Sequence, residues 1–290
     1  MITPYENKVM TSFMLYLDNK VSSNLQAYTN YGSHFFSTTR QYSNVYSYSA
    51  PYKQLVSDES VSGATVMSGV KLDGNFIVPG QSGLHSIDHR RGIVYFTGQI
   101  TGQNRISGDY SVKDLNVFIT SIDEETVLFD TKFETKPPTP QVVTGLGPEE
   151  QTYPALFIRG ISTRNEPAGF GGLDQTIINT RVIVLANSAF QLDAVCSYLR
   201  DLNKTLVPPV SDKLPFNAYG AYTGKAYNYT GIASPLAANN SGIFINSVYV
   251  NKNASLKRGA GYSDLPVEVY SAFVDYELAE FRKPRTDVEN

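Results

Sequence analysis

The stretch "HSIDHRR" holds the side chains best suited to chemistry: His85, Asp88 and His89, followed at once by Arg90 and Arg91. Imidazole and carboxylate groups bind metals and act as general acids or bases. If the segment formed a helical turn, the H-x₂-D-H spacing would place two or three of these side chains around one metal ion. A metal or acid–base site is therefore one interpretation of this stretch.

The flanking sequence favours a different interpretation. Gly83 and Gly92 bracket the stretch, and "GIVYFTG" after it has the composition of a strand. Adjacent residues of an extended chain point to opposite faces, so Asp88 and His89 would diverge. The sequence therefore predicts a β-hairpin turn. We expect its charged residues at the tip of a loop, in contact with another subunit, and we assign no metal or catalytic role to them.

The rest of the chain offers little further chemistry. The one cysteine, Cys196, lies in the apolar, helical context "LDAVCSYL", which is typical of a buried structural thiol. The acidic pairs Glu124–Glu125 and Glu149–Glu150 fall in predicted turns, where charge is usually solvated. No nucleophile-elbow, zinc-protease, phosphate-loop or dinucleotide motif is present. We expect no catalytic residue, no bound metal and no cofactor.

Composition limits the classes of function. The 290 residues carry 24 Lys and Arg against 27 Asp and Glu, a net charge of −3, so no overall basic field concentrates nucleic acid. Hydrophobic residues make up 41%, enough for a sizeable core. Twenty tyrosines and no tryptophan favour half-buried sheet faces and protein interfaces. No signal or membrane-spanning pattern is visible, so we expect folding in a reducing cytoplasm.

The first half of the chain divides into a helix, an arm and a β domain. Residues 1–24 predict a helix with a Thr3–Glu6 capping box and a broad apolar stripe. Residues 25–52 are polar, aromatic and almost uncharged, which favours an extended aromatic arm that reaches a neighbour. Residues 53–135 contain short alternating runs such as "GATVMSGVKL" and "GIVYFTG", which predict an all-β sandwich or barrel. Residues 136–153 are rich in proline and glycine and predict a linker.

The second half, residues 154–290, predicts an α+β unit. "PALFIRGIST" and "QTIINTRVIVLA" are strand patterns joined by the glycine-rich hairpin loop "RNEPAGFGGLD". Ser188 then caps a helix with Gln191 at the capping-box position. One face of that helix is apolar and carries Leu192, Val195, Cys196, Leu199 and Leu202. Residues 203–242 form a long loop, and two strands close the unit.

The order of these elements resembles the tail-terminator proteins of tailed bacteriophages. The helix that follows directly on "VIVLA" and the closing strand "AFVDYEL" carry the resemblance, which covers residues 3–22 and 153–278. The opening "MITPYENKVMTSFMLYLDNKV" and the β region are also similar to structural proteins of contractile-tailed phages, including those of marine cyanophages. The resemblance implies an α+β core of two helices on a mixed or antiparallel sheet, with an inserted β domain and long Tyr-rich loops.

The resemblance also implies a role in the virion. The chain would form a ring of six copies in the neck, at the head-to-tail connection or at the tail terminus. Its partners would be itself and other neck or tail proteins, with DNA passing through the channel and no membrane. Two alternatives stay open: a baseplate or fibre-attachment subunit, and a carbohydrate-binding module or hydrolase of the tail apparatus.

The expected contact residues are aromatic side chains of the long loops and charged side chains of the predicted turns. They are Tyr28, Tyr31, Phe35, Phe36, Tyr46, Tyr48, His85, His89, Arg90, Arg91, Arg164, Phe170, Tyr219, Tyr222, Tyr227 and Tyr229.

Overall fold

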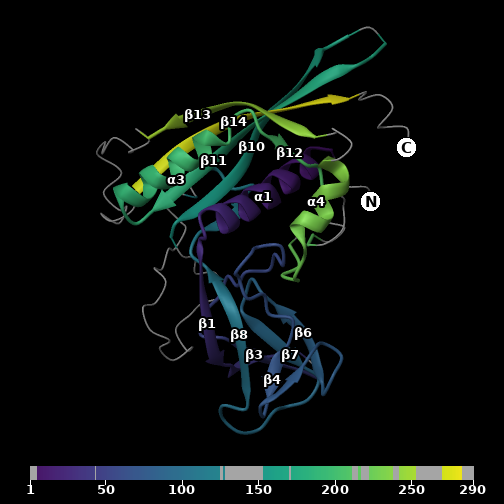
Figure 1. The fold of residues 1–290 in the computed structure, drawn as a ribbon, viewed down its shortest axis with the longest axis vertical. Coiled ribbons are helices and arrows are strands. Elements are labelled where there is room, and N and C mark those ends of the chain that lie inside the picture. The colour runs from purple at the N-terminus through teal and green to yellow at the C-terminus, as the bar shows by residue number, and fades with distance from the viewer. Residues whose placement is uncertain are drawn as a thin grey trace.

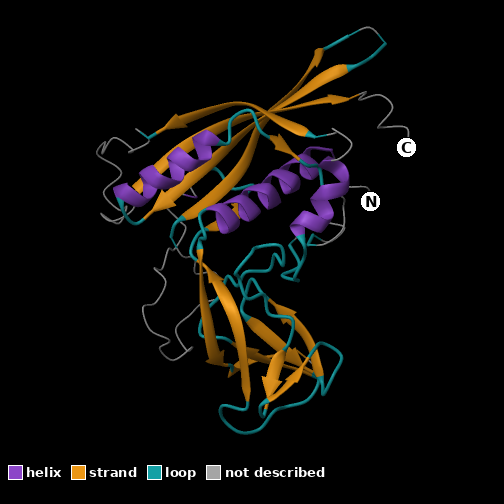
Figure 2. Cartoon of the chain, in the orientation of Figure 1, coloured by secondary structure: helices purple, strands orange, loops and turns teal. Residues whose placement is uncertain are grey.

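The structure is a computed structural model with an α+β part and a β domain (Figures 1 and 2). The α+β part holds a six-stranded sheet and the helices, and the β domain holds two four-stranded sheets. The described residues are 5–42, 44–124, 127, 153–169, 171–210, 215–216, 222–237, 242–252 and 270–282. The capping residue Thr3 and the predicted linker up to residue 152 lie outside them.

The six-stranded sheet has the order β12-β13-β14-β11-β10-β9. Every neighbouring pair is antiparallel except β9 and β10, which run parallel. The mixed sheet matches the α+β class expected from the sequence. Its strands are β9 (Asn116–Ile119), β10 (Ala155–Pro167), β11 (Asp174–Ala186), β12 (Leu206–Val207), β13 (Ile243–Asn251) and β14 (Tyr270–Arg282).

Two helices, α1 (Tyr5–Asn24) and α3 (Ala189–Asp201), pack on one face of this sheet and bury its largest apolar cluster. Phe13 of α1 meets Tyr276 of β14 edge to face, with ring centroids 4.9 Å apart. A third helix, α4 (Tyr229–Ala237), lies beside α1 (Figure 1). The opposite face of the sheet holds a smaller apolar cluster.

The start of α3 follows the sequence prediction. The Ser188 side chain accepts a hydrogen bond from the backbone N–H of Gln191 at 3.2 Å. The Gln191 side chain in turn accepts one from the backbone N–H of Asn187 at 3.3 Å. These bonds satisfy amide groups that the first helical turn leaves open. All five residues of the predicted apolar face are buried, which confirms that face.

Two four-stranded sheets form the β domain around a shared core that contains Phe35, Tyr48, Phe96 and Tyr110. One sheet has the order β1-β8-β4-β5 and the other β2-β3-β7-β6. The strands are β1 (Tyr28–His34), β2 (Phe36–Tyr42), β3 (Val45–Ser49), β4 (Val70–Leu72), β5 (Asn75–Ile77), β6 (Leu84–Asp88), β7 (Ile93–Phe96) and β8 (Ile106–Lys113).

The predicted arm over residues 25–52 is wrong. β1 pairs along its full length with β8, and β3 pairs with β7. The alternation of aromatic and small polar residues, which resembles an exposed loop in composition, places rings such as Phe35 and Tyr48 in the core. The β domain therefore begins near residue 28, and it ends at Lys113, because β9 belongs to the other sheet.

The predicted long loop over residues 203–242 also needs correction, because it contains β12 and α4. The segment between them contacts the β domain: Asp58 forms a bridge with Tyr227.

Candidate functional site

A buried ion pair lies where the two parts meet. Lys113 Nζ at the end of β8 donates to both carboxylate oxygens of Asp18 in α1, each at 2.7 Å. The two side chains are only 10% and 2% exposed. Burial is the largest single influence and would lower the pKa of Lys113, but the Asp18 carboxylate together with Tyr222 and Asp58 outweighs it, and the net pKa is raised. The Tyr227 hydroxyl adds a hydrogen bond to Asp18 at 3.1 Å.

A second buried carboxylate, Asp58, extends this contact to α4. Its Oδ1 accepts the backbone N–H of Tyr229, the first residue of α4, at 3.0 Å. Its Oδ2 accepts the side-chain amide of Asn19 in α1 at 2.8 Å. Asp18, Asp58, Lys113 and these partners together form what we call the domain joint. The joint ties α1, α4 and the β domain into one unit.

His89 adds a third link. Its ring is 2% exposed and lies between two backbone carbonyls, with Nδ1 2.9 Å from Gly224 O and Nε2 3.0 Å from Met67 O. Burial lowers the pKa of His89, and the two carbonyls partly oppose that effect. The expected contact of His89 with another subunit is therefore wrong: the residue holds the segment before α4 against the β6–β7 turn.

The hairpin predicted around this histidine is confirmed, because β6 and β7 pair antiparallel. His85 is exposed and bonds Ser86, while Asp88 accepts the backbone N–H of Arg91 at 3.1 Å. The H-x₂-D-H pattern thus places its three side chains in different surroundings. Within the part of the chain that the structure describes, no three His, Cys, Asp or Glu side chains are placed to share a metal ion.

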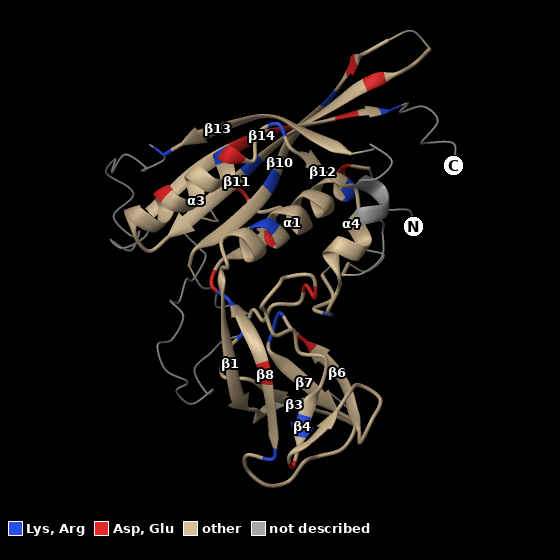
Figure 3. Ribbon diagram, viewed as in Figure 1, with Lys and Arg blue, Asp and Glu red and all other residues tan. Residues whose placement is uncertain are grey.

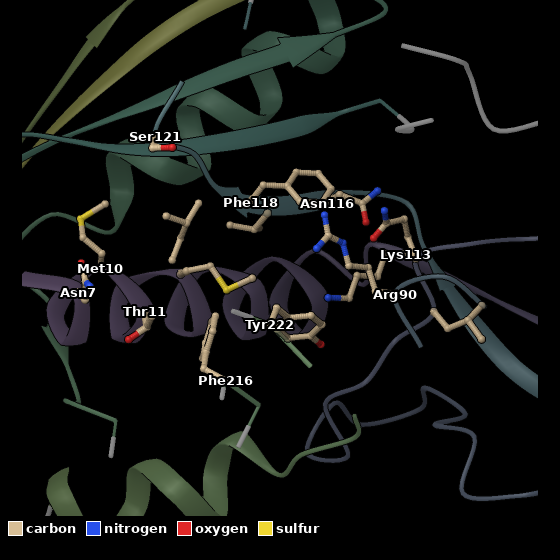
Figure 4. A pocket seen from close by; sticks show the side chains of 15 residues that line it. Asn7, Met10, Thr11, Arg90, Lys113, Asn116, Phe118, Ser121, Phe216 and Tyr222 are labelled. Carbon is tan, nitrogen blue, oxygen red and sulfur yellow. The ribbon is translucent and has the colours of Figure 1, made fainter. Parts of the chain in front are cut away.

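A cleft of about 540 Å³ opens beside the joint, between α1 and β9 (Figure 4). Its apolar wall includes Met10 and Met14 of α1 and Ile119 of β9. Among the lining residues that the structure describes there is no acidic side chain, and of the two cations, Arg90 and Lys113, the second is neutralised by Asp18. The lining residues are Asn7, Met10, Thr11, Met14, Gln54, Leu55, Arg90, Lys113, Asn116, Val117, Phe118, Ile119, Ser121, Phe216 and Tyr222.

A second notable feature is the outer half of the β10–β11 hairpin. This hairpin extension, residues 162–167 and 174–179, projects beyond the helices (Figure 1). Every residue of β10 from Gly160 to Pro167 is exposed. Arg164 pairs with Glu166 at 2.8 Å and lies 3.6 Å from Glu277 of β14. Figure 3 shows charges of both signs along this projection.

The structure separates the expected contact residues by exposure. Five of them are exposed: Phe36, whose side chain is 44% exposed, and His85, Arg90, Arg91 and Arg164. Those in the interior are Phe35, Tyr48, His89, Tyr227 and Tyr229, and those partly buried are Tyr28, Tyr31, Tyr46 and Tyr222. Phe170 and Tyr219 lie outside the described residues.

Sequence reasoning missed Asp18, Asp58 and Lys113. One signal was present for Asp18, which interrupts the apolar run "MLYLDNKV" on a helix face that is otherwise core-like. A carboxylate in that position needs a buried partner. Nothing in the sequence identified Lys113 as that partner, since the two residues are 95 positions apart.

Comparisons with known proteins add no assignment. No family model matches the chain, and no curated protein matches it significantly. Among the described helices, none combines the length and apolar character needed to cross a membrane.

Proposed function

We propose that this chain is a structural subunit of a tailed-bacteriophage particle, acting through protein–protein interfaces. It would assemble as a ring of six in the neck or tail-terminator region. One observation carries the proposal: the hairpin extension projects from the body, and no described strand pairs with its β10 edge beyond Ile158.

An exposed strand edge favours pairing with another chain, because its backbone N–H and C=O groups lack partners. In a monomer such an edge promotes aggregation. In an assembly subunit it provides a contact with a neighbour. β14 runs beside the extension and pairs Arg282 with Asp174, and α1 holds this part of β14: the Tyr5 hydroxyl donates to Glu280 at 2.6 Å and the Arg282 guanidinium lies 3.6 Å from the Tyr5 ring.

The arrangement of the α+β part gives further support. The elements on which the phage resemblance depends are α1, β10, β11, α3 and β14, and all five belong to one sheet and its helical layer. That arrangement supports the proposal, because the resemblance implies an α+β core built from these elements. It concerns the fold alone, so the station in the particle is a proposal from the resemblance.

The test is the oligomeric state of the purified full chain. We expect sedimentation velocity to give a mass near six times 32.0 kDa at micromolar concentration, and negative-stain images to show rings. A chain that stays monomeric across the accessible concentration range, both alone and with particle extracts from infected cells, would overturn the proposal.

A further inference from the structure

We propose that the outer edge of β9, at the back of the cleft, binds the outer edge of β10 from a second copy of this chain. The inference rests on the proposed assembly role and names the contact that would build the ring. The mode is strand addition, in which main-chain hydrogen bonds extend a sheet across two molecules.

The first half of the contact is the open edge of β9. The N–H of Asn116 donates to Pro154 O at 3.2 Å, and that of Thr120 donates to Ile158 O at 2.9 Å. Residues of a strand alternate in the side to which their backbone groups point, so Val117 and Ile119 direct their N–H and C=O away from β10. β9 is the last of the described strands of its sheet, and its whole length lines the cleft.

The second half is the outer edge of the hairpin extension. The N–H of Ala168 donates to Leu173 O at 3.0 Å. Because every second residue of a strand bonds the same neighbour, Glu166 and Arg164 are the next residues whose backbone groups bond β11. Thr163 and Asn165 therefore direct their backbone groups outward. Pro167, which has no N–H to donate, occupies the next outward position and ends the edge, as proline does on edge strands.

These two edges match in length and in side chains. Each presents two consecutive outward residues, and β9 of the same molecule covers β10 only from Ala155 to Ile158. Ile161, which is 50% exposed at the base of the extension, would find an apolar wall in the cleft. The described lining of the cleft holds Arg90 and Lys113 and no acid, and Glu166 of the second copy would supply a carboxylate for Arg90.

The geometry also favours a closed assembly. The two surfaces differ, so each copy offers an extension to one neighbour and a cleft to the other. Such head-to-tail contacts form a ring when the rotation between copies closes. A contact between two β10 edges would instead give a two-fold dimer, so the two modes are distinguishable.

Engineered disulfides test the contact. Cys196 is fully buried, so cysteines introduced at the surface are the accessible thiols. We expect the double variant Ile119→Cys/Asn165→Cys, or Ile119→Cys/Thr163→Cys for the alternative register, to form a disulfide-linked ladder on oxidation. Each single variant should stay monomeric on a denaturing gel. The matched control Ile119→Cys/His85→Cys, with its second thiol on β6, should give no ladder.

A second variant tests the backbone bonds. Ile119→Pro removes one outward N–H and leaves the bonds to β10 intact, so its circular dichroism and urea midpoint should remain those of the parent. We expect its assembly to weaken at least tenfold in sedimentation velocity. Unchanged assembly in this variant would overturn the inference.

The remaining outcomes separate the inference from the function on which it rests. A dimer from Asn165→Cys alone would show a β10–β10 contact and overturn the inference. A parent ring that gives no ladder in either double variant would also overturn it and leave the proposed function standing. A parent protein that sediments only as a monomer, both alone and with particle extracts from infected cells, would overturn the proposed function itself.

Discussion

Lys113 Nζ lies 2.7 Å from each carboxylate oxygen of Asp18, and this pair joins the last strand of the β domain to the middle of α1. Both side chains are withdrawn from water. Each charge is therefore stabilised almost entirely by the other, with Tyr227 as an auxiliary donor.

Removing one member of the pair should destabilise the protein strongly. Lys113→Met leaves Asp18 buried and uncompensated, at a cost of about 3–5 kcal/mol in the free energy of unfolding. Urea denaturation followed by circular dichroism measures this loss of stability.

Lys71→Met is the matched control, because the Lys71–Asp109 pair is 46% and 62% exposed and contributes less than about 1 kcal/mol. The double variant Asp18→Leu/Lys113→Met should recover much of the loss. Equal effects of Lys113→Met and Lys71→Met would contradict the prediction.

His89 should make the stability depend on pH. Burial lowers the pKa of His89 in the folded protein below the unfolded value of about 6.5. The unfolded chain then binds the proton more tightly, so the stabilisation is present above pH 6.5 and is lost as the pH falls below it. Two influences raise the pKa of His89 and so oppose burial: the hydrogen bonds from the imidazolium to Gly224 O and Met67 O, and the charge of the nearby Asp88 carboxylate. The charge of Lys113 lowers the pKa, as burial does.

The measurement is the urea midpoint between pH 5 and 8 for the parent and for His89→Gln. We expect a steeper fall toward acid in the parent than in the variant. His85→Gln, at an exposed histidine, should reproduce the slope of the parent. If His89→Gln kept the full acid slope, another group would be responsible.

Gly224 should tolerate no side chain. Its φ is +72°, and an added Cβ would collide with the carboxylate of Asp88. Gly74 has a similar φ of +86° but open space around it. Gly224→Ala should therefore lower the free energy of unfolding more than Gly74→Ala, which introduces only backbone strain of roughly 1 kcal/mol. Urea denaturation of the two variants gives the comparison, and equal losses would argue against a close contact of Gly224 with the β6–β7 hairpin.

Cys196 should be inert in the folded protein. It is fully buried in α3, and desolvation raises the pKa of its thiol to about 11. Thiolate is the reactive form, so little is present at pH 8. We expect a colorimetric disulfide reagent to react at the rate of unfolding in buffer and at once in 6 M guanidinium. Rapid labelling of the native protein would show that α3 opens locally.

The sequence predicted best where a single segment carried the whole signal. The α3 helix followed from Ser188 and one apolar face, and the β10–β11 hairpin followed from two β-branched runs around a glycine-rich loop. It failed where burial depends on distant partners. Residues 28–49 resemble a polar loop because their tyrosines and serines are compatible with either state, and only pairing with β7 and β8 decides it.

The joint was unpredictable for the same reason. Asp18 lies in an apolar run and needs a buried partner, but Lys113 is in the sequence an ordinary solvated charge, and their pairing requires the two parts to be placed together. His89 shows the converse case. Its neighbourhood suggested chemistry, yet its ring nitrogens face two backbone carbonyls from segments 22 and 135 residues away, so its role is to hold the fold.

A charge exchange between the cleft and the hairpin extension should report on their contact. Arg90 and Glu166 are both exposed, so reversing either charge should leave the free energy of unfolding within about 0.5 kcal/mol of the parent. Glu166→Lys should nevertheless weaken assembly at least tenfold in sedimentation velocity, because it places a cation against Arg90. Arg90→Glu should weaken assembly as well, and the combined variant Arg90→Glu/Glu166→Lys should restore most of the lost assembly.

Arg91→Glu, one residue along the chain and outside the cleft lining, is the matched control and should assemble normally. If the combined variant assembled no better than either single one, Arg90 and Glu166 would not be partners across the interface.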